Sequence, residues 1–315
     1  MPKYRNDLPQ LNGGIFLTDG GIETTLIFHD GLELPYFAAF HLLKDKDGAD
    51  ALRKYFRSHA SIARAHKTGF ILESPTWRAS ADWGAKLGYS AADIAEVNRR
   101  SIGLMQELRE EFETPRSPMV ISGCVGPRGD GYDPGQVMSE AEAEAYHRQQ
   151  IGAFGETEVD LVTAITMTNT PEAIGLVRAA AGYELPVVVA FTVETDGRLP
   201  TGQDLKDAIA AVDAATDAAP AYYMVNCAHP THFEAALTTD DSWIMRLRGV
   251  RANASRRSHA ELNEAPDLDE GDPVELGAQY ARLLRQHPQI NVLGGCCGTD
   301  HRHIEQIASA CKAVA

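Results

Sequence analysis

Apolar residues gather in eight short runs along the chain, and longer stretches with a helical repeat of apolar positions separate these runs. Several runs are apolar without interruption, as at Val187 to Phe191, whereas a strand with one solvated face alternates apolar and polar positions. Uninterrupted runs are typical of parallel strands that are covered on both faces. The predicted strands are Gly14–Thr18, Phe70–Glu73, Met119–Ser122, Asp160–Ile165, Val187–Thr192, Tyr222–Asn226, Leu247–Asn253 and Ile290–Leu293.

The stretches between the runs predict amphipathic helices, because apolar residues recur there every three or four positions. Parallel strands need crossover connections, and eight strand–helix units in about 300 residues favour a closed (βα)8 TIM barrel, an α/β fold of one domain. An open doubly wound sheet is the alternative, but no Gly-x-Gly-x-x-Gly turn follows the first run. The predicted helices are Ala49–Lys67, Ala91–Glu111, Glu140–Gly155, Gln203–Thr216, Pro273–Gln286 and His301–Ala313.

One segment fits neither pattern. Arg256–Asp272 is polar and rich in acidic residues, and its apolar positions follow no helical repeat. It predicts a long loop without a helix after the seventh strand. Long loops at the ends of barrel strands commonly shape substrate sites.

The net negative charge of the chain limits the classes of partner that it can bind. Its 29 Lys and Arg against 44 Asp and Glu give a formal net charge of −15, which repels nucleic acid and anionic membrane surfaces. No apolar run approaches the ~20 residues of a membrane span, and no apolar signal segment follows the first charges. We therefore expect a cytoplasmic protein without nucleic-acid or membrane partners. Its assembly into a homo-oligomer is left open.

The five cysteines indicate thiol chemistry, because an odd number that includes an adjacent pair does not fit a secreted disulfide framework. Cys227 follows the sixth run, and Cys296 and Cys297 follow the eighth. The carboxyl ends of barrel strands meet at one face, so thiols roughly seventy residues apart can come together there. The glycines around the pair, Gly294, Gly295 and Gly298, allow the backbone to bend so that both thiols face one ion.

Three thiolates around a tetrahedral ion leave one position open, which is typical of a catalytic Zn²⁺ site. Such a site would take a substrate thiol as its fourth ligand and prepare it for alkyl transfer. Two alternatives are three buried free thiols, and a redox-active disulfide between the adjacent cysteines Cys296 and Cys297.

Two motifs resemble a known family. Leu293-Gly-Gly-Cys-Cys-Gly-Thr299 looks like the zinc motif, and Val225-Asn226-Cys227 like the Asn-Cys motif, of the zinc-dependent homocysteine S-methyltransferases. That family includes the betaine–homocysteine and S-methylmethionine–homocysteine methyltransferases and the homocysteine domain of cobalamin-dependent methionine synthase. The resemblance implies a homocysteine-binding-like barrel over residues 1–315, with Cys227, Cys296 and Cys297 as catalytic metal ligands. It also implies a thiol S-methyltransferase of methionine biosynthesis that uses a methyl donor and a thiol acceptor.

Weaker resemblances imply substrate contacts. Thr18–Thr24 is similar to the family's first-strand element, in which the aspartate and the following glycine, here Asp19 and Gly20, lie at the amino-acid substrate. Leu72–Ala79 is similar to the stretch after the second strand, so Ser74 and Thr76 would offer hydroxyls to the substrate carboxylate. Asn253 lies in a turn like the family's Pro-Asn-Ala turn after strand seven.

One difference from the family's sequence pattern concerns the residue that recognises the methyl acceptor. The family carries on its fourth strand a glutamate that binds the homocysteine amino group, where this chain has Ile165. We therefore expect no strong preference for homocysteine over a thiol acid without the amino group, unless Glu23, Glu73 or Glu194 binds the ammonium. Glu73, at the end of the second strand, is the leading candidate for that contact.

Two other functions fit the same residues. One is a demethylase that passes a methyl group from a sulfonium or methylated amine to a thiol. The other is a non-catalytic barrel that binds zinc or a metabolite, which the loss of the family glutamate at Ile165 would favour.

Overall fold

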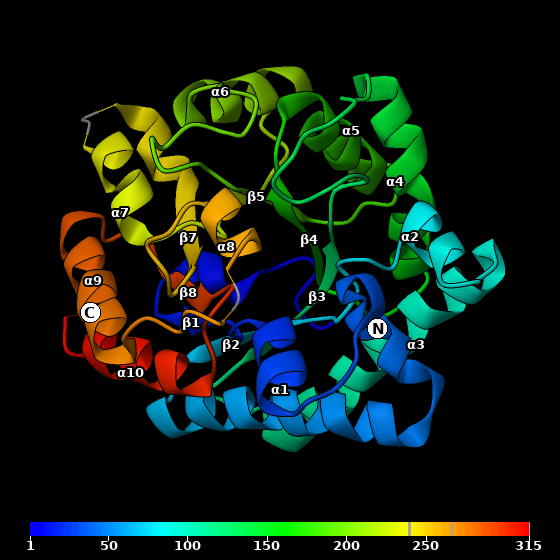
Figure 1. Cartoon of the computed structure of the whole chain (residues 1–315), viewed down its shortest axis with the longest axis horizontal. Coiled ribbons are helices and arrows are strands. Elements are labelled where there is room, and N and C mark those ends of the chain that lie inside the picture. The colour runs from blue at the N-terminus through cyan, green and yellow to red at the C-terminus, as the bar shows by residue number, and fades with distance from the viewer. Residues whose placement is uncertain (239–240, 266, 315) are drawn as a thin grey trace.

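Eight parallel strands form a closed barrel in chain order, with β1 paired to both β2 and β8 (Figure 1). The computed structural model describes residues 1–238, 241–265 and 267–314. The predicted TIM barrel of one α/β domain is therefore confirmed. The strands are β1 Phe16–Leu17, β2 Gly69–Glu73, β3 Met119–Val125, β4 Leu161–Met167, β5 Val187–Phe191, β6 Tyr222–Asn226, β7 Leu247–Ala252 and β8 Val292–Gly295.

Helices surround the barrel, and the six predicted ones are present within a few residues of their expected ends. The prediction of Arg256–Asp272 as a loop without a helix is wrong in part, because α8 lies inside it. Ser258 and Glu261 form a reciprocal capping box that starts this short helix. The helices are α1 Lys46–His66, α2 Ala81–Lys86, α3 Ala91–Phe112, α4 Glu140–Gly155, α5 Thr170–Ala181, α6 Leu205–Thr216, α7 Pro230–Phe233, α8 His259–Asn263, α9 Pro273–Gln286 and α10 His301–Lys312.

The barrel interior is apolar in its lower layers and polar toward the carboxyl ends of the strands. Phe16, Val120, Tyr222 and Met224 belong to a buried cluster inside the ring, while a second, larger cluster lies between strands and helices. This double burial explains the uninterrupted apolar runs. Higher in the ring the buried side chains become polar and charged, which places the reactive groups at one end of the barrel.

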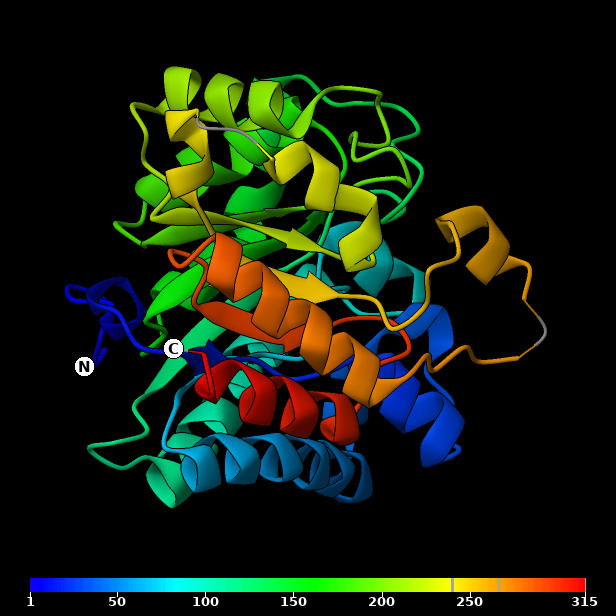
Figure 2. The same cartoon turned by 90° about the vertical axis from the view of Figure 1, so that its left-hand side faces the viewer.

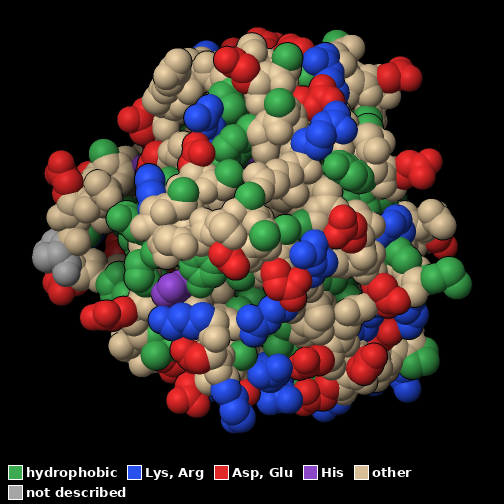
Figure 3. Space-filling view, turned by 90° about the vertical axis from the view of Figure 1, so that its right-hand side faces the viewer, with side chains coloured by type: hydrophobic (Ala, Val, Ile, Leu, Met, Phe, Trp, Pro, Cys, Tyr) green, Lys and Arg blue, Asp and Glu red, His purple; other side chains and the backbone are tan. Residues whose placement is uncertain are grey.

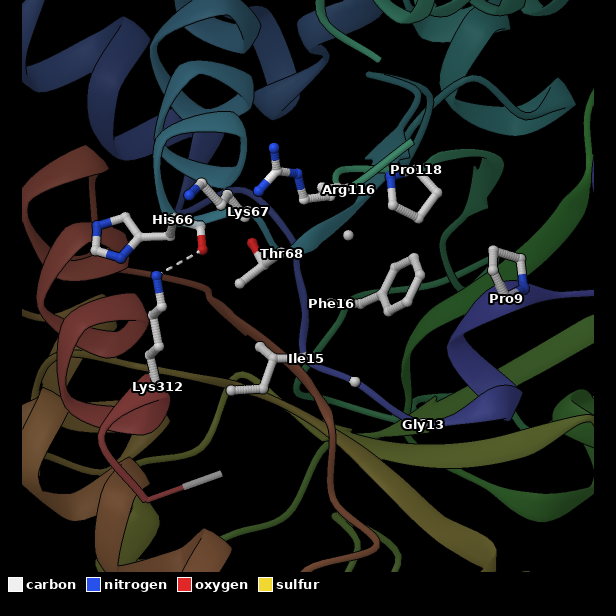
Figure 4. A pocket seen from close by; sticks show the side chains of 12 residues that line it. Pro9, Gly13, Ile15, Phe16, His66, Lys67, Thr68, Arg116, Pro118 and Lys312 are labelled. Atoms are coloured by element: carbon white, nitrogen blue, oxygen red, sulfur yellow. Dashed lines mark hydrogen bonds between the residues drawn. The ribbon is translucent and has the colours of Figure 1, made fainter. Parts of the chain in front are cut away.

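The two ends of the barrel differ in what they carry. In Figure 2 the strand arrows point toward the side where α8 projects, and both labelled chain ends lie on the opposite side. A cavity of about 370 Å³ lies at the amino ends of the first three strands, with Phe16, Gly69, Lys67, Arg116 and Lys312 among its lining residues (Figure 4). This cavity is therefore at the end away from the cysteines.

The surface agrees with the charge of the sequence. On the face shown in Figure 3, Lys and Arg side chains are interspersed with Asp and Glu rather than gathered into a basic patch. Among the helices described for residues 1–238, 241–265 and 267–314, none is long and apolar enough to cross a membrane.

Candidate functional site

The three cysteines of the predicted zinc site come together above the carboxyl ends of β6 and β8. Their sulfur atoms all lie within 4.8 Å of one another. The strand between them, β7, positions two of them through its backbone, since Cys227 N donates to Arg251 O at 3.0 Å and Cys296 N donates to Ala252 O at 2.8 Å. A separation of 69 residues is thus closed by barrel geometry.

Cys227 and Cys296 are joined by a disulfide bond, while Cys297 is a free, partly exposed thiol. The alternative of a disulfide within the adjacent pair is therefore not what the structure shows. The bond lies inside the cluster of expected metal ligands, so its reduction would release two thiols beside the free thiol of Cys297.

The backbone around these cysteines is shaped by close contacts. Gly298 has φ +79°, in the left-handed region that favours glycine, and its amide donates to Thr24 Oγ1 at 3.0 Å. A Cβ atom on Gly21 would approach Cys296 O to 2.5 Å. The loop after β1 and the turn after β8 can pack this closely only because a glycine stands at each contact.

The three thiols fit a Zn²⁺ ion once they are reduced. Zn–S bonds of about 2.3 Å in a tetrahedron place sulfurs ~3.8 Å apart, so the sulfurs of Cys227 and Cys296, which are bonded to each other here, would separate around the ion. Burial raises the pKa of the Cys297 thiol, so this thiol needs a nearby cation to ionise near neutral pH. Tyr132 Oη lies 3.2 Å from Cys297 Sγ, within hydrogen-bonding distance of this thiol.

Below the cysteines, Asp19 is held in a buried ion pair. Its Oδ1 accepts from Arg251 Nη2 at 2.7 Å and its Oδ2 accepts from the Tyr55 hydroxyl at 2.8 Å. The neighbouring Gly20 contributes its carbonyl oxygen, which also accepts from Tyr55, at 2.9 Å. Asp19 and Gly20 thus lie near the strand that holds the cysteines, and the Asp19 carboxylate is already paired with a cation.

Glu73 lies inside the barrel, 5% exposed, and hydrogen-bonds to the side chains of Ser122 and Thr163. Its Oε2 has no hydrogen-bond partner among the described residues. Burial raises the pKa of Glu73 to about 7, and burial likewise raises the pKa of Glu23 to about 7. Both acids are therefore poised to change charge near neutral pH.

Ser74 and Thr76 lie next to Cys124, and their hydroxyl protons are used within the protein. Thr76 Oγ1 donates to Cys124 O at 2.7 Å, so Ser74 Oγ is the donor in the 2.7 Å bond between the two hydroxyls. Ser74 Oγ also accepts from Cys124 N at 3.0 Å. These hydroxyls brace β3 and, in this arrangement, have no proton to offer a substrate carboxylate.

Asn253 and His259 both support Cys227. Asn253 Nδ2 donates to Cys227 O at 3.0 Å, and His259 Nε2 lies 2.5 Å from the same oxygen. The His259 ring stacks on Tyr132, with 4.1 Å between ring centroids, and its Nδ1 lies 3.1 Å from Glu194. Asn253 thus contacts the backbone of Cys227. Glu194 contacts His259, the first residue of α8.

Ile165 lies near the end of β4 in the apolar cluster inside the barrel. The next residue, Thr166, has φ +64°, and Asn226 holds it by two hydrogen bonds, at 2.9 Å to its amide and 2.8 Å to its hydroxyl. The asparagine of the Asn-Cys motif therefore fixes the bend in β4 as well as the start of the turn that carries Cys227.

The sequence analysis missed three site residues: Arg251, Tyr132 and His259. Arg251 had a usable signal, because a charged residue in a run buried on both faces points into the barrel or ends the strand. His259 follows the Ser-x-x-Glu capping signature at Ser258. Tyr132 lies in an irregular loop and carried no such signal.

A second group of possible metal ligands, His29, Glu270 and Asp300, lies beside this site. Arg302 Nη2 lies 3.0 Å from Glu270 and 2.6 Å from Asp300, so a guanidinium already balances these carboxylates. We interpret this group as an ion-pair cluster that ties the segment after α8 to the barrel.

Comparison with known proteins agrees with this site. A family model described as homocysteine S-methyltransferase matches residues 16–311. Homocysteine S-methyltransferase 4 of Zea mays is 24% identical over 95% of this chain and 90% of its own length. Betaine–homocysteine S-methyltransferase 1 of Rattus norvegicus is 24% identical over 96% of this chain and 74% of its own. A methionine synthase of Mycobacterium leprae is 25% identical over 82% of this chain, but only 20% of that protein is matched.

The solved structures show the same fold. The homocysteine methyltransferase MmuM of Escherichia coli in its oxidised form superimposes with a TM-score of 0.75 at 21% identity, covering 94% of this chain and 95% of that one. Its metallated form gives 0.74 at 21% identity, covering 96% and 97%. The family match extends over nearly all of the barrel and includes all three cysteines of the cluster. The chain therefore belongs to the homocysteine S-methyltransferase family and is a methyltransferase.

Proposed function

We propose that Cys227, Cys296 and Cys297 bind one Zn²⁺ ion and that the enzyme moves a methyl group from a small-molecule donor to the thiol of homocysteine or a related acceptor. The observation that carries this proposal is the meeting of three cysteine sulfurs, within 4.8 Å of one another, at the carboxyl ends of two barrel strands. Three thiolates leave one tetrahedral position open, as catalytic zinc sites do. The metallated form of the Escherichia coli relative supports a metal in this fold.

Zinc bound there would lower the pKa of the acceptor thiol, so that its sulfur is a thiolate and still a nucleophile near neutral pH. In the transfer, a bond forms between the acceptor sulfur and the methyl carbon while the bond from that carbon to the donor breaks. A sulfonium or ammonium donor keeps the electron pair of that bond and leaves as a neutral thioether or amine. The thiol proton is lost before transfer, so the step needs no protein base.

The chain's own residues would order the reactants. The Tyr132 hydroxyl, at 3.2 Å from Cys297 Sγ, would exchange this contact when Cys297 binds the metal. The charge of Glu23 acts on Cys297 and that of Glu73 on Arg251, and burial raises the pKa of each acid to about 7. A cationic donor would favour their ionised forms and be held by them, because opposite charges stabilise one another strongly in a buried site.

The test is the zinc content of reduced protein with matched cysteine variants. We expect about one zinc per chain in the parent, and loss of both metal and activity in Cys227→Ser, Cys296→Ser and Cys297→Ser with the circular dichroism of the fold unchanged. Cys311→Ser is the control, since Cys311 is a buried free thiol on α10, outside the cluster. Stoichiometric zinc in all three cluster variants would refute the metal site.

Product analysis separates the enzyme from a binding barrel. With homocysteine and a set of sulfonium and ammonium donors, mass spectrometry should detect a methylated thiol. Zinc retained by the parent, with no methylated product from any donor, would instead favour the non-catalytic function.

A further inference from the structure

Arg251 places a guanidinium inside the barrel directly below the cysteines. It lies on β7, where its own carbonyl accepts from Cys227 N and the carbonyl of the next residue accepts from Cys296 N. Its Nε donates to Gly295 O at 3.2 Å and its Nη2 to Asp19 at 2.7 Å. The remaining nitrogen, Nη1, makes no hydrogen bond within the described part of the chain, and the side chain is 10% exposed. The guanidinium therefore has a donor edge free for another group.

The ion pair with Arg251 also makes Asp19 unsuitable for binding an ammonium group. Both carboxylate oxygens of Asp19 already accept a hydrogen bond, and the Arg251 guanidinium neutralises its charge. An ammonium brought to Asp19 would also approach the guanidinium, and like charges repel strongly in a buried site. Since Ile165 supplies no charge either, Glu73 is the carboxyl of this region that still has an oxygen without a partner among the described residues, and its charge also acts on Arg251.

The usual hydroxyl donors for a carboxylate are also committed. The protons of Ser74 and Thr76 are used in the bonds that end at Cys124 O. Arg78, another buried arginine, lies over the rings of Trp77 and Trp83 and donates to Gly129 O, while its Nε has no partner among the described residues. Arg251 is favoured over Arg78 because its strand is hydrogen-bonded to both Cys227 and Cys296, which places its guanidinium on the element that holds the thiols.

We propose that Arg251 binds the carboxylate of the thiol acceptor, and that the acceptor is a thiol acid whose amino group is not needed for recognition. This inference rests on the proposed function, since it names the acceptor class of that same site. A guanidinium fork offers parallel N–H donors to a carboxylate, and such charge-assisted bonds are short and directional. Asp19 and Gly295 O hold the opposite edge of the fork and so orient the free one.

The competing outcome assigns the ammonium contact to Glu73, which has one oxygen without a partner. If Glu73 binds the amino group, an acceptor that lacks an amino group binds more weakly. Recognition by Arg251 would instead depend on the carboxylate of the acceptor.

The test compares binding of three thioethers, which have the shape of methylated products and need no turnover. Isothermal titration of reduced, zinc-loaded protein would use methionine, 4-(methylthio)butanoate and 3-(methylthio)propylamine, which carry both charged groups, the carboxylate alone and the amine alone. We expect the butanoate to bind within about 10-fold of methionine and the propylamine more than about 100-fold more weakly. Comparable binding of the amine and methionine would overturn the proposal.

Variants then assign the effect to one residue. Arg251→Gln should weaken both carboxylate ligands by at least about 30-fold, and Arg251→Lys, which keeps the charge without the fork, by less. The control is Arg248→Gln, at the other end of β7, where the guanidinium donates to Leu11 O and binding should be unchanged. If the Arg251 variants do not fold because Asp19 is left unpaired, the ligand series in the parent still decides.

Two kinds of failure can be told apart. If homocysteine is methylated but Arg251→Gln binds the carboxylate ligands as the parent does, only this inference is wrong. If no thioether binds the parent and no thiol is methylated, the proposed function fails, and this inference fails with it.

Discussion

Glu73 is a carboxylic acid in a place that disfavours its charge. It is 5% exposed, one of its oxygens lacks a partner, and burial raises its pKa to about 7. In the unfolded chain the same group loses its proton near its ordinary value of 4.5. The folded state therefore binds more protons than the unfolded state between these two values, so the free energy of unfolding falls as the pH rises through this window.

Replacement of this acid should remove that pH dependence. The ionisation costs the folded parent about 3 kcal/mol above pH 7 and nothing below pH 4, and Glu73→Gln carries no such cost. We expect the stability of the variant relative to the parent to improve by about this amount from pH 4 to pH 8, measured by urea unfolding. Glu110→Gln, at an exposed position, is the control and should show no such trend. A stability difference that stays constant with pH would contradict the argument.

Residues of the site differ in how far the sequence reveals them. The three cysteines were predictable because their motifs are specific and strand ends converge in a barrel. The pairing of Asp19 with Arg251 was not, since it joins residues 232 apart and depends on which way one side chain points inside the ring. The hydroxyl bonds of Ser74 and Thr76 were equally hidden, because they depend on β3 continuing past Ser122 to Val125. Their predicted substrate roles stay predictions.

Among the elements, β4 shows how a polar residue on one strand shapes another. Thr166 interrupts the pairing register of β4 with a left-handed residue, and Asn226 on β6 satisfies both its amide and its hydroxyl. The strand predicted as Asp160–Ile165 continues through this bend to Met167. Side-chain support of this kind leaves no mark in hydrophobic periodicity.

Loss of that support should affect both the fold and the metal. Asn226→Ala removes two buried hydrogen bonds and should lower stability by about 2 kcal/mol. Because Cys227 follows directly, we also expect about 10-fold weaker zinc binding, measured by competition with a chelating dye. Asn291→Ala is a matched control, since Asn291 also makes two buried bonds, to Gln10 O and Gly14 O, at the other end of the barrel.

The two asparagines should therefore separate stability from metal affinity. Both variants lose comparable stability, but only Asn226→Ala should lose zinc affinity. Equal zinc affinities for the two variants would show that the bend in β4 does not position the metal ligands.

At the scale of the whole molecule, eight strand–helix units, several of them with uninterrupted apolar runs, were enough to predict a closed barrel, because a ring buries every strand on both faces without an edge. Helix α5 was not among the predicted helices and α8 was unexpected, since single short elements carry little periodic signal. A cytoplasmic location and the extent of the domain over residues 1–315 stay predictions.

Closure of the ring makes the fold depend on its last units. β8 pairs with both β7 and β1, and α10 packs against α9 and α1. A chain truncated before Val292 would leave two unpaired strand edges and expose the apolar interior. We expect it to be insoluble, whereas a nick within the long segment after β7 should leave the ring intact. A stable, cooperatively unfolding fragment of residues 1–220 would contradict this.

Because the barrel is closed, the polypeptide chain could begin and end at other positions in the ring. Pro9 and Lys312 line one cavity at the amino end of the barrel, so the first and last segments of the chain both reach this end, far from the cysteines, although the ends themselves lie on opposite sides of the ring (Figures 1, 2 and 4). A ring of paired strands has no intrinsic first member. A peptide linker long enough to cross the amino end of the barrel, with new termini opened in the exposed turn at Tyr183 and Glu184, would keep all eight strand pairings and the cysteine cluster. The protein is thus a natural candidate for circular permutation, in which the start of the gene can be chosen without changing the enzyme's architecture.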